Sequence, residues 1–217
     1  MIIEKETSMA AWKTALKLLI GEGRTVIDHE DRTSKELLNM IITINHPEKD
    51  IAEPISSMRE LKKWVYPEPE ELEDVIFQKE SSSVYYYTYG ARLFNYANEK
   101  NQVDDYLIPL LKKDINTRRA ISIVYYPLSD SRPETKESPG LISIFFKVLD
   151  GKLTVSTLLR SNDMFIGWPA NIYQIYLLQK YVADKLGLEA GSITTISHSA
   201  HIFEEYNEEI GRIIRRE

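Results

Sequence analysis

The sequence predicts an α+β protein in which a sheet is backed by one long helix. Residues 141–149 and 153–159 have strand composition, and they are joined by Asp150-Gly151, the strongest two-residue hairpin signal. Residues 169–186 are apolar on most faces of a helix and are followed by Gly187, so we expect a long central helix that ends there. A sheet that is covered by such a helix is typical of the α+β class.

Apolar spacing and turn residues predict the other elements of the N-terminal half. We expect a helix from Met9 to Ile20 that ends at Gly21-Glu22-Gly23, and then a strand over residues 38–44 that ends before His46-Pro47. A helix over residues 54–65 follows. After the break at residues 66–71 we expect a short helix with acidic residues in its first turn. Residues 84–89 fit a short strand or a loop equally well, because Gly90 follows the tyrosines at once.

The second half adds further elements to the hairpin and the long helix. We expect a helix over residues 103–113, a buried strand over residues 120–126 stopped by Pro127, and a mobile loop over residues 129–139. A strand follows over residues 192–196. From Ile202 onward, acidic and apolar residues alternate in a pattern that predicts an amphipathic terminal helix.

Composition limits the possible classes of protein. The chain has 217 residues, of which 43% are hydrophobic and 28% are charged, so we expect one domain over residues 1–217 with a real core. No apolar run approaches the roughly 18 residues that span a bilayer, and the N-terminus has no secretory signal pattern. With no cysteine, the chain has neither a disulfide nor a thiol nucleophile. We therefore expect a cytoplasmic protein without a membrane partner.

The charge balance argues against a nucleic-acid partner. The formal net charge is −6 at pH 7, which disfavours non-specific binding to nucleic acid through a basic face. A single anionic ligand that a few arginines bind remains compatible with this charge. His198 and His201 are close in sequence, but no cysteine accompanies them, so we expect no metal site.

Generic motifs for phosphate, dinucleotide or hydrolase sites are absent from the sequence. Seven short stretches, however, follow one another in an order that is informative as a set. They are residues 116–120 (NTRRA), 138–141 (SPGL), 150–153 (DGKL), 160–163 (RSND), 167–172 (GWPANI), 179–183 (QKYVA) and 199–203 (SAHIF). This series resembles the thymidylate synthase superfamily, which includes the pyrimidine-nucleotide hydroxymethylases, and it is most similar to the short archaeal-type members. The resemblance covers residues 87–203 well and the N-terminal third loosely, through Asp31-Arg32-Thr33.

The resemblance implies a site for a pyrimidine nucleoside monophosphate. It assigns the 5′-phosphate to Arg160 and Ser161, and Arg32 could match a further phosphate arginine of the N-terminal loop. Arg118 and Arg119 match arginines that reach the phosphate from the other subunit of a homodimer formed through the sheet. Guanidinium groups suit this task because they bind phosphate oxygens in pairs. The alternative is that Arg118 and Arg119 only begin a strand at the surface.

Base and cofactor contacts are implied in the same way. Asn171 matches the asparagine that reads the edge of uracil, and Tyr89 matches a tyrosine that transfers protons at the base. Asp163 and Gly167 match residues that line the base and folate pocket, which implies methylene-tetrahydrofolate or a related pterin as cofactor. Alternatively, Asn171 is buried and structurally satisfied, and the tyrosines belong to a half-buried strand.

Two positions depart from the family pattern. His201 matches the histidine that binds the sugar 3′-hydroxyl, but Phe203 occupies the place of the tyrosine that follows it, so one hydrogen bond to the sugar is lost. Gly140 occupies the place of the cysteine whose thiolate adds to C6 of the pyrimidine. A cysteine introduced at residue 140 would restore that nucleophile, unless Gly140 is needed for a close backbone approach that any Cβ would obstruct.

Three functions remain open on this reading. The chain could be a dUMP-type C5 methyl- or hydroxymethyltransferase with altered chemistry. It could be a non-catalytic module that binds pyrimidine nucleotides, or a different nucleotide enzyme on the same scaffold. Nucleotide binding is expected under all three.

Overall fold

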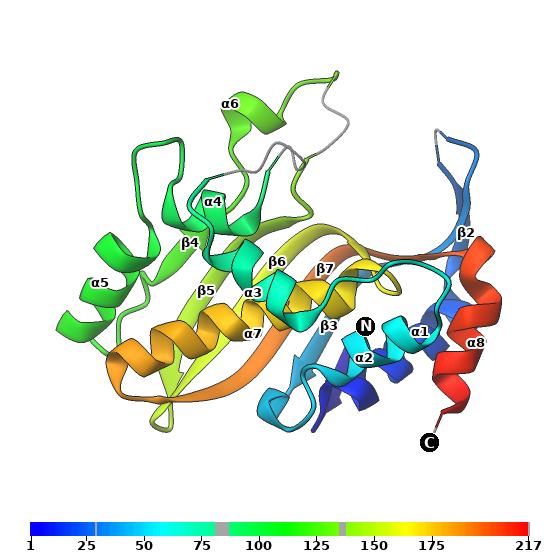
Figure 1. Cartoon of the computed structure of the whole chain (residues 1–217), viewed down its shortest axis with the longest axis horizontal. Coiled ribbons are helices and arrows are strands. Elements are labelled where there is room, and N and C mark those ends of the chain that lie inside the picture. The colour runs from blue at the N-terminus through cyan, green and yellow to red at the C-terminus, as the bar shows by residue number, and fades with distance from the viewer. Residues whose placement is uncertain (29, 81–86, 135–137, 217) are drawn as a thin grey trace.

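The computed structural model describes residues 1–28, 30–80, 87–134 and 138–216 (Figure 1). Its elements in chain order are β1 (Ile2–Lys5), α1 (Ser8–Glu22), β2 (Arg24–Ile27), β3 (Thr33–Ile44), η1 (Pro47–Lys49), α2 (Glu53–Glu60), α3 (Pro69–Phe77), α4 (Tyr89–Phe94), η2 (Val103–Leu107), α5 (Ile108–Lys113), β4 (Ile121–Ile123), α6 (Pro127–Asp130), β5 (Leu141–Leu149), β6 (Lys152–Asp163), α7 (Gly167–Leu186), β7 (Glu189–Phe203), η3 (Glu204–Tyr206) and α8 (Asn207–Arg215). None of the helices in these described ranges is long and apolar enough to cross a membrane.

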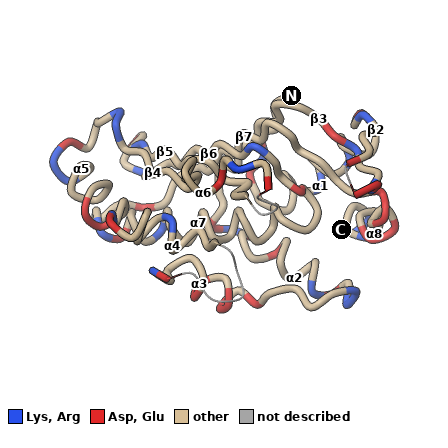
Figure 2. The backbone as a smooth tube through the Cα atoms, turned by 90° about the horizontal axis from the view of Figure 1, so that it is seen from above, with Lys and Arg blue, Asp and Glu red and all other residues tan. Residues whose placement is uncertain are grey.

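The strands form one mixed sheet. Its order is β1-β3-β7-β6-β5-β4, and β2 pairs with β3 outside this path. The pairs β1·β3 and β6·β7 are parallel, and the other pairs are antiparallel. Figure 1 shows α7 lying across the sheet, and Figure 2 shows α2, α3 and α7 on one side of it. The predicted α+β class, with a sheet backed by a long helix, is confirmed.

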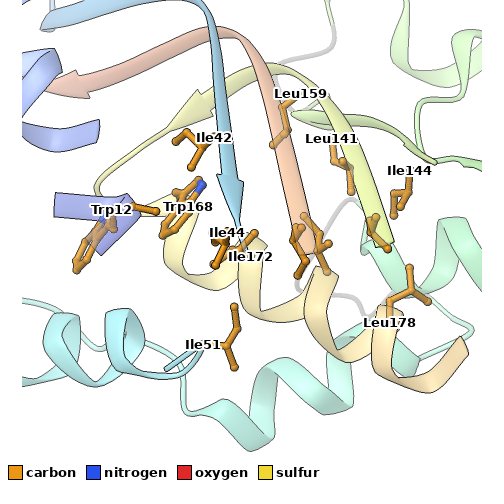
Figure 3. Close-up of a cluster of buried hydrophobic side chains, with 14 of the residues drawn as sticks. Trp12, Ile42, Ile44, Ile51, Leu141, Ile144, Leu159, Trp168, Ile172 and Leu178 are labelled. Carbon is orange, nitrogen blue, oxygen red and sulfur yellow. The ribbon is translucent and has the colours of Figure 1, made fainter. Parts of the chain in front are cut away.

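The core lies between the sheet and these helices. Ile42 and Ile44 of β3 meet Trp168 and Ile172 of α7 there, and all four are at most 1% exposed (Figure 3). The buried Trp12 of α1 has a hydrogen-bond partner for its indole nitrogen, which donates to the carbonyl of Met164 at 2.6 Å. Burial of large side chains on this scale is the main favourable term that holds α7 against the sheet.

The two strongest local predictions are confirmed with their expected turn chemistry. β5 and β6 form the hairpin, and Asp150 and Gly151 have φ angles of 50° and 77°, as a two-residue turn of this kind requires. α7 ends at Gly187, whose φ of 68° allows its N–H to bond the carbonyls of the preceding turn.

Strand lengths differ from the predictions. The strand predicted over residues 192–196 extends through Phe203, so the terminal helix expected from Ile202 begins only at Asn207. The physical reason is that β7 lies between β6 and β3 and finds hydrogen-bond partners on both edges over most of its length. Conversely, the strand predicted over residues 120–126 is reduced to β4, because Val124 and Tyr125 both turn their N–H groups toward the single carbonyl of Ile142.

Smaller differences concern the helices and two segments. The helix predicted over residues 54–65 ends at Glu60, and Lys62 then adopts a φ of 54°. The helix expected over residues 103–113 is present, but it begins with the π-helical turn η2. Of the segment 84–89, residues 84–86 lie outside the described residues, and Tyr89 begins a helix. Likewise, residues 135–137 of the expected loop lie outside them.

At one level of the sheet, β6 and β7 change which of their two faces is turned toward α7. Buried residues alternate up to Leu159 in β6 and Ser197 in β7, but the next buried residues are Asn162 and Ala200, three positions later. At this level β5 shifts its register against β6, and Asn39 of β3 has a φ of 56°. Because side chains alternate along a strand, such an irregularity moves the following residues to the opposite face.

Candidate functional site

The end of β6 holds the segment before β5 in place through Arg160. Its Nε donates to the carbonyl of Pro139 at 3.0 Å, and one Nη donates to the carbonyl of Ser138 at 2.6 Å. Its backbone N–H also bonds the carbonyl of Gly140 at 2.8 Å. The other terminal nitrogen, Nη1, makes no hydrogen bond to the described residues, so it is available to an anion.

Gly140 lies where two backbones nearly touch. A Cβ at this residue would stand 2.7 Å from the carbonyl oxygen of Ser161, closer than real Cβ contacts come. The obstacle is backbone, so a side chain at residue 140 would require β5 and β6 to move apart. Of the two interpretations of Gly140, this geometry favours the close backbone approach.

Tyr89 and Asn171 are brought together by the first turns of two helices. The Tyr89 hydroxyl, at the start of α4, donates to Oδ1 of Asn171 in α7 at 3.2 Å. Burial raises the pKa of the Tyr89 hydroxyl well above its ordinary value of 10.0, although the charge of Arg160 acts in the opposite direction. The hydroxyl is therefore protonated at neutral pH. The alternative of a half-buried strand does not hold for Tyr89, which is helical.

Asp163 is the last residue of β6, and its side chain binds the backbone of the segment that leads into α7. Its Oδ1 accepts hydrogen bonds from the N–H groups of Phe165 and Ile166, both at 2.9 Å. Burial raises the pKa of the Asp163 carboxyl, while the nearby charges of His201 and Arg32 act to lower it. Asp163, His201 and Arg32 thus form one electrostatic group, although they come from β6, β7 and the turn before β3.

Phe203 is packed between the His201 ring and the Arg32 guanidinium. Its ring centroid lies 5.3 Å from that of His201, edge to face. The guanidinium carbon of Arg32 stands 4.3 Å from the Phe203 ring centroid, within cation–π range. Arg32 also pairs with Asp28 and Glu30 in the β2–β3 turn, at 3.0 and 3.3 Å. This turn therefore carries Arg32 to the site.

Arg118 and Arg119 do not reach this group. They are exposed and precede β4, in which Ile121 pairs with Phe145 in the middle of β5, so the antiparallel direction carries the two arginines toward the end of β5 far from Gly140. At about 3.4 Å per residue, roughly 20 Å of strand separate them from Gly140. Within one copy of the chain, these two arginines stay outside the site.

Sequence reasoning missed Glu36 and Ser199. The register of β3 and β7 places Glu36 opposite His201, and the Ser199 hydroxyl donates to Oε1 of Glu36 at 2.5 Å. The predicted strand began at residue 38, so Glu36 fell outside it. A strand extended back to Thr33 would have placed Glu36 on the sheet, but only the pairing shows its neighbour. Among the described residues, no group of three histidine or acidic side chains could hold a metal ion.

Comparison with known proteins places this geometry in a family. The family model for thymidylate synthase matches residues 56–217. The chain belongs to the thymidylate synthase family. All of the residues described above except Arg32, Glu36 and the β2–β3 turn lie within the matched range.

Individual thymidylate synthase relatives extend the match over the N-terminal third. Proteins named "Putative thymidylate synthase" from Methanosarcina barkeri and Methanocaldococcus jannaschii are 32% and 30% identical to this chain. The alignments cover 99% and 94% of this chain, and 94% and 90% of those proteins. A "Deoxyuridylate hydroxymethyltransferase" of Bacillus phage SP01 is 35% identical over 49% of this chain and 28% of its own length.

The buried carboxyl of Asp163 leads to a prediction about pH. Replacement by Asn keeps an oxygen for the two backbone N–H groups but removes the ionisation. Because the folded pKa lies above the reference value of 3.8, the carboxyl contributes stability below that value and loses it as pH rises through the raised pKa. We therefore expect Asp163→Asn to gain in melting temperature relative to the wild type as pH rises from about 4 to 8.

The control for this measurement is Asp184→Asn, because Asp184 is exposed and pairs with Lys180 in the preceding turn of α7. This control should show no such gain. A wild type that becomes more stable than Asp163→Asn with rising pH would mean that the charged form of Asp163 is the favoured one.

Proposed function

We propose that the chain binds a pyrimidine nucleoside 5′-monophosphate of the dUMP type, on the scaffold of a C5 methyl- or hydroxymethyltransferase. The observation that carries this proposal is the convergence of Arg160, Tyr89, Asn171, Asp163 and His201 at one end of the sheet, from four different elements. A phosphate, a pyrimidine edge and a sugar each find a suitable group there. Family membership and the phage hydroxymethyltransferase support the same ligand class.

The phosphate would be bound by Arg160 and Ser161, with help from Arg32. Two nitrogens of Arg160 are occupied by the carbonyls of residues 138 and 139, which fixes the guanidinium and leaves Nη1 for the ligand. A guanidinium that is already oriented loses less side-chain entropy when it binds an anion.

The base would be read by Asn171. Its Oδ1 already accepts the Tyr89 hydroxyl but has a second lone pair for N3–H of uracil, and its amide nitrogen can donate to O4. Because Tyr89 keeps its proton, it holds the amide of Asn171 in this orientation. Cytosine presents the opposite pattern at these two atoms, so we expect uracil to be preferred.

The residues also fit methylene-tetrahydrofolate, the cofactor that the family implies. A Cβ at Gly167 would lie 3.6 Å from Cβ of Asp163 and 3.7 Å from the amide nitrogen of Asn171, so the glycine keeps the space between them open. Asp163 offers a carboxylate to the amino group of a pterin ring. When bound, the folate would supply the one-carbon unit.

A second candidate function is a non-catalytic nucleotide-binding module. It is favoured by Gly140, since the sequence contains no cysteine and a side chain at residue 140 has no room. Attack of a thiolate on C6 of the pyrimidine therefore has no source in this chain. Binding of the nucleotide is common to both functions, and only the transfer of a carbon unit separates them.

We further propose a homodimer formed through the face of the sheet opposite α7. In one row across the strands, Ile196 stands between Ile41 and Leu158, and none of these side chains is charged. The next row contains Thr43, Thr194, Ser156 and Phe145, and Figure 2 shows none of the helices of the described residues on this side of the strands. An uncharged face of this kind, with apolar side chains in one row, suits a twofold contact, which would let Arg118 and Arg119 serve the partner's phosphate.

Thermal stabilisation tests the nucleotide site. We expect dUMP to raise the melting temperature more than dCMP and far more than deoxyuridine, which lacks the phosphate. At a hundredfold excess over Kd, binding adds about 2.7 kcal/mol of stability, or roughly 5–10 °C for a chain of this size. Arg160→Met should abolish the shift, whereas Arg212→Met, at an exposed arginine of α8 that pairs with Glu208, should leave it unchanged. If no pyrimidine monophosphate shifts the wild type, the proposed function is wrong.

Intact-mass analysis tests the missing nucleophile. The unmodified chain should form no covalent adduct with 5-fluoro-dUMP, with or without methylene-tetrahydrofolate. Gly140→Cys and Gly140→Ala should both lose about 1–3 kcal/mol of unfolding free energy, because either Cβ meets the Ser161 carbonyl. Gly21→Ala is the control, since a Cβ there meets nothing within 4 Å. An adduct on the unmodified chain would identify another nucleophile and contradict the assignment of Gly140.

Light scattering tests the dimer. The wild type should be dimeric at micromolar concentration, and Leu158→Glu should make it monomeric and weaken dUMP binding by removing the partner's arginines. Val65→Glu serves as the control, because Val65 is fully exposed away from the sheet face. If the wild type is a monomer, Arg118 and Arg119 have no route to the phosphate.

A further inference from the structure

A carboxylate stands beside His201 on the neighbouring strand. The antiparallel register pairs Glu36 of β3 with His201 of β7, and the parallel register pairs His201 with Asp163 of β6. Directly paired residues share one face of a sheet, so the imidazole lies in a row between two acidic side chains. Glu36 is therefore as close to the sugar position as the register allows any β3 residue to be.

The Glu36 carboxylate is oriented but not neutralised. Oε1 accepts the Ser199 hydroxyl at 2.5 Å, and Oε2 has no hydrogen bond to the described residues. Arg24 lies opposite it on β2, but no ion pair joins the two among those residues. Lys35, the adjacent cation, turns instead to Glu204 at 3.7 Å. This partly buried carboxylate has one oxygen held by Ser199 and unused lone pairs on the other, so it can accept further hydrogen bonds from a ligand.

Sugar hydroxyls are the donors that fit this acceptor. Phe203 lies on the same strand as His201, but its side chain has no polar atom that could contact a sugar. Its ring packs against His201 and Arg32. Besides His201 itself, the Glu36 carboxylate on the paired strand is therefore a polar contact available to a sugar bound at this place. A ribose presents two neighbouring hydroxyls, whereas a deoxyribose presents only one, and hydrogen bonds to a charged carboxylate are stronger than those between neutral groups.

We propose that Glu36 accepts hydrogen bonds from the 2′- and 3′-hydroxyls of the nucleotide, so that the site prefers a pyrimidine ribonucleotide to the deoxyribonucleotide. This inference rests on the proposed nucleotide site and specifies its sugar. The hydroxyls would take the free lone pairs of Glu36, while the Ser199 hydroxyl holds Oε1 of the carboxylate in place.

Calorimetric titration with UMP, dUMP and 2′-O-methyl-UMP tests the inference. The wild type should bind UMP about tenfold more tightly than dUMP, as a hydrogen bond to a charged group predicts. The methylated nucleotide should bind like dUMP or more weakly, because it has lost the 2′ donor. Glu36→Gln should lower the ratio of UMP to dUMP affinity to about one, mainly by weakening UMP.

Two further variants make the test decisive. Glu36→Asp withdraws the carboxylate by one methylene and should also lower the ratio, with less risk to folding. Glu189→Gln, at the far end of β7 in an exposed pair with Lys152, should leave the ratio at its wild-type value. The inference is overturned if the wild type binds dUMP as tightly as UMP, or if the Glu36 variants weaken both nucleotides equally. If no pyrimidine monophosphate binds at all, the proposed function itself fails.

Discussion

Strands β6 and β7 exchange their buried and exposed faces at the level of Asn39 of β3, and the polar strand residues of the candidate site lie at or beyond that level. On one side of it, β6 and β7 turn Leu159 and Ser197 toward α7 and bury them in the core. On the other side, Asn162 and Ala200 take the core positions, so that Asp163 and His201 are released to the other face. The same strands can therefore supply both a packed core and a polar site, because side chains alternate at every residue.

The tight contact between the start of β5 and the end of β6 determines what the site can do. Arg160 binds the carbonyls of Ser138 and Pro139, and its own N–H bonds Gly140, which draws the two backbones together. That contact fixes the Arg160 guanidinium, and it also removes the room for a side chain at residue 140. On the proposed match, in which Gly140 takes the place of the family's nucleophilic cysteine, the chain would combine an ordered phosphate arginine with no thiol nucleophile.

Charge is distributed unevenly around the site. Asp163 and Glu36 flank His201, the residue proposed to bind the sugar, whereas the phosphate is proposed to rely on Arg160, Arg32 and the arginines of a second copy. An isolated chain would expose a site with few cations. In the proposed dimer, association through the uncharged sheet face would add the partner's arginines to the site. The dimer would then contribute to phosphate binding as well as burying apolar surface.

Local signals in the sequence determined several parts of this protein by themselves. Asp150 and Gly151 specify the hairpin because few residues adopt positive φ, and the apolar pattern before Gly187 specifies α7. The order of short motifs indicated the family, and with it the residues now proposed for the site. Only the tertiary structure decided the length of β7, the phase change beyond Ser197, and the pairing of Glu36 with His201. These features depend on hydrogen bonds between strands that are far apart in the chain, and no local pattern of residues encodes which partners will meet.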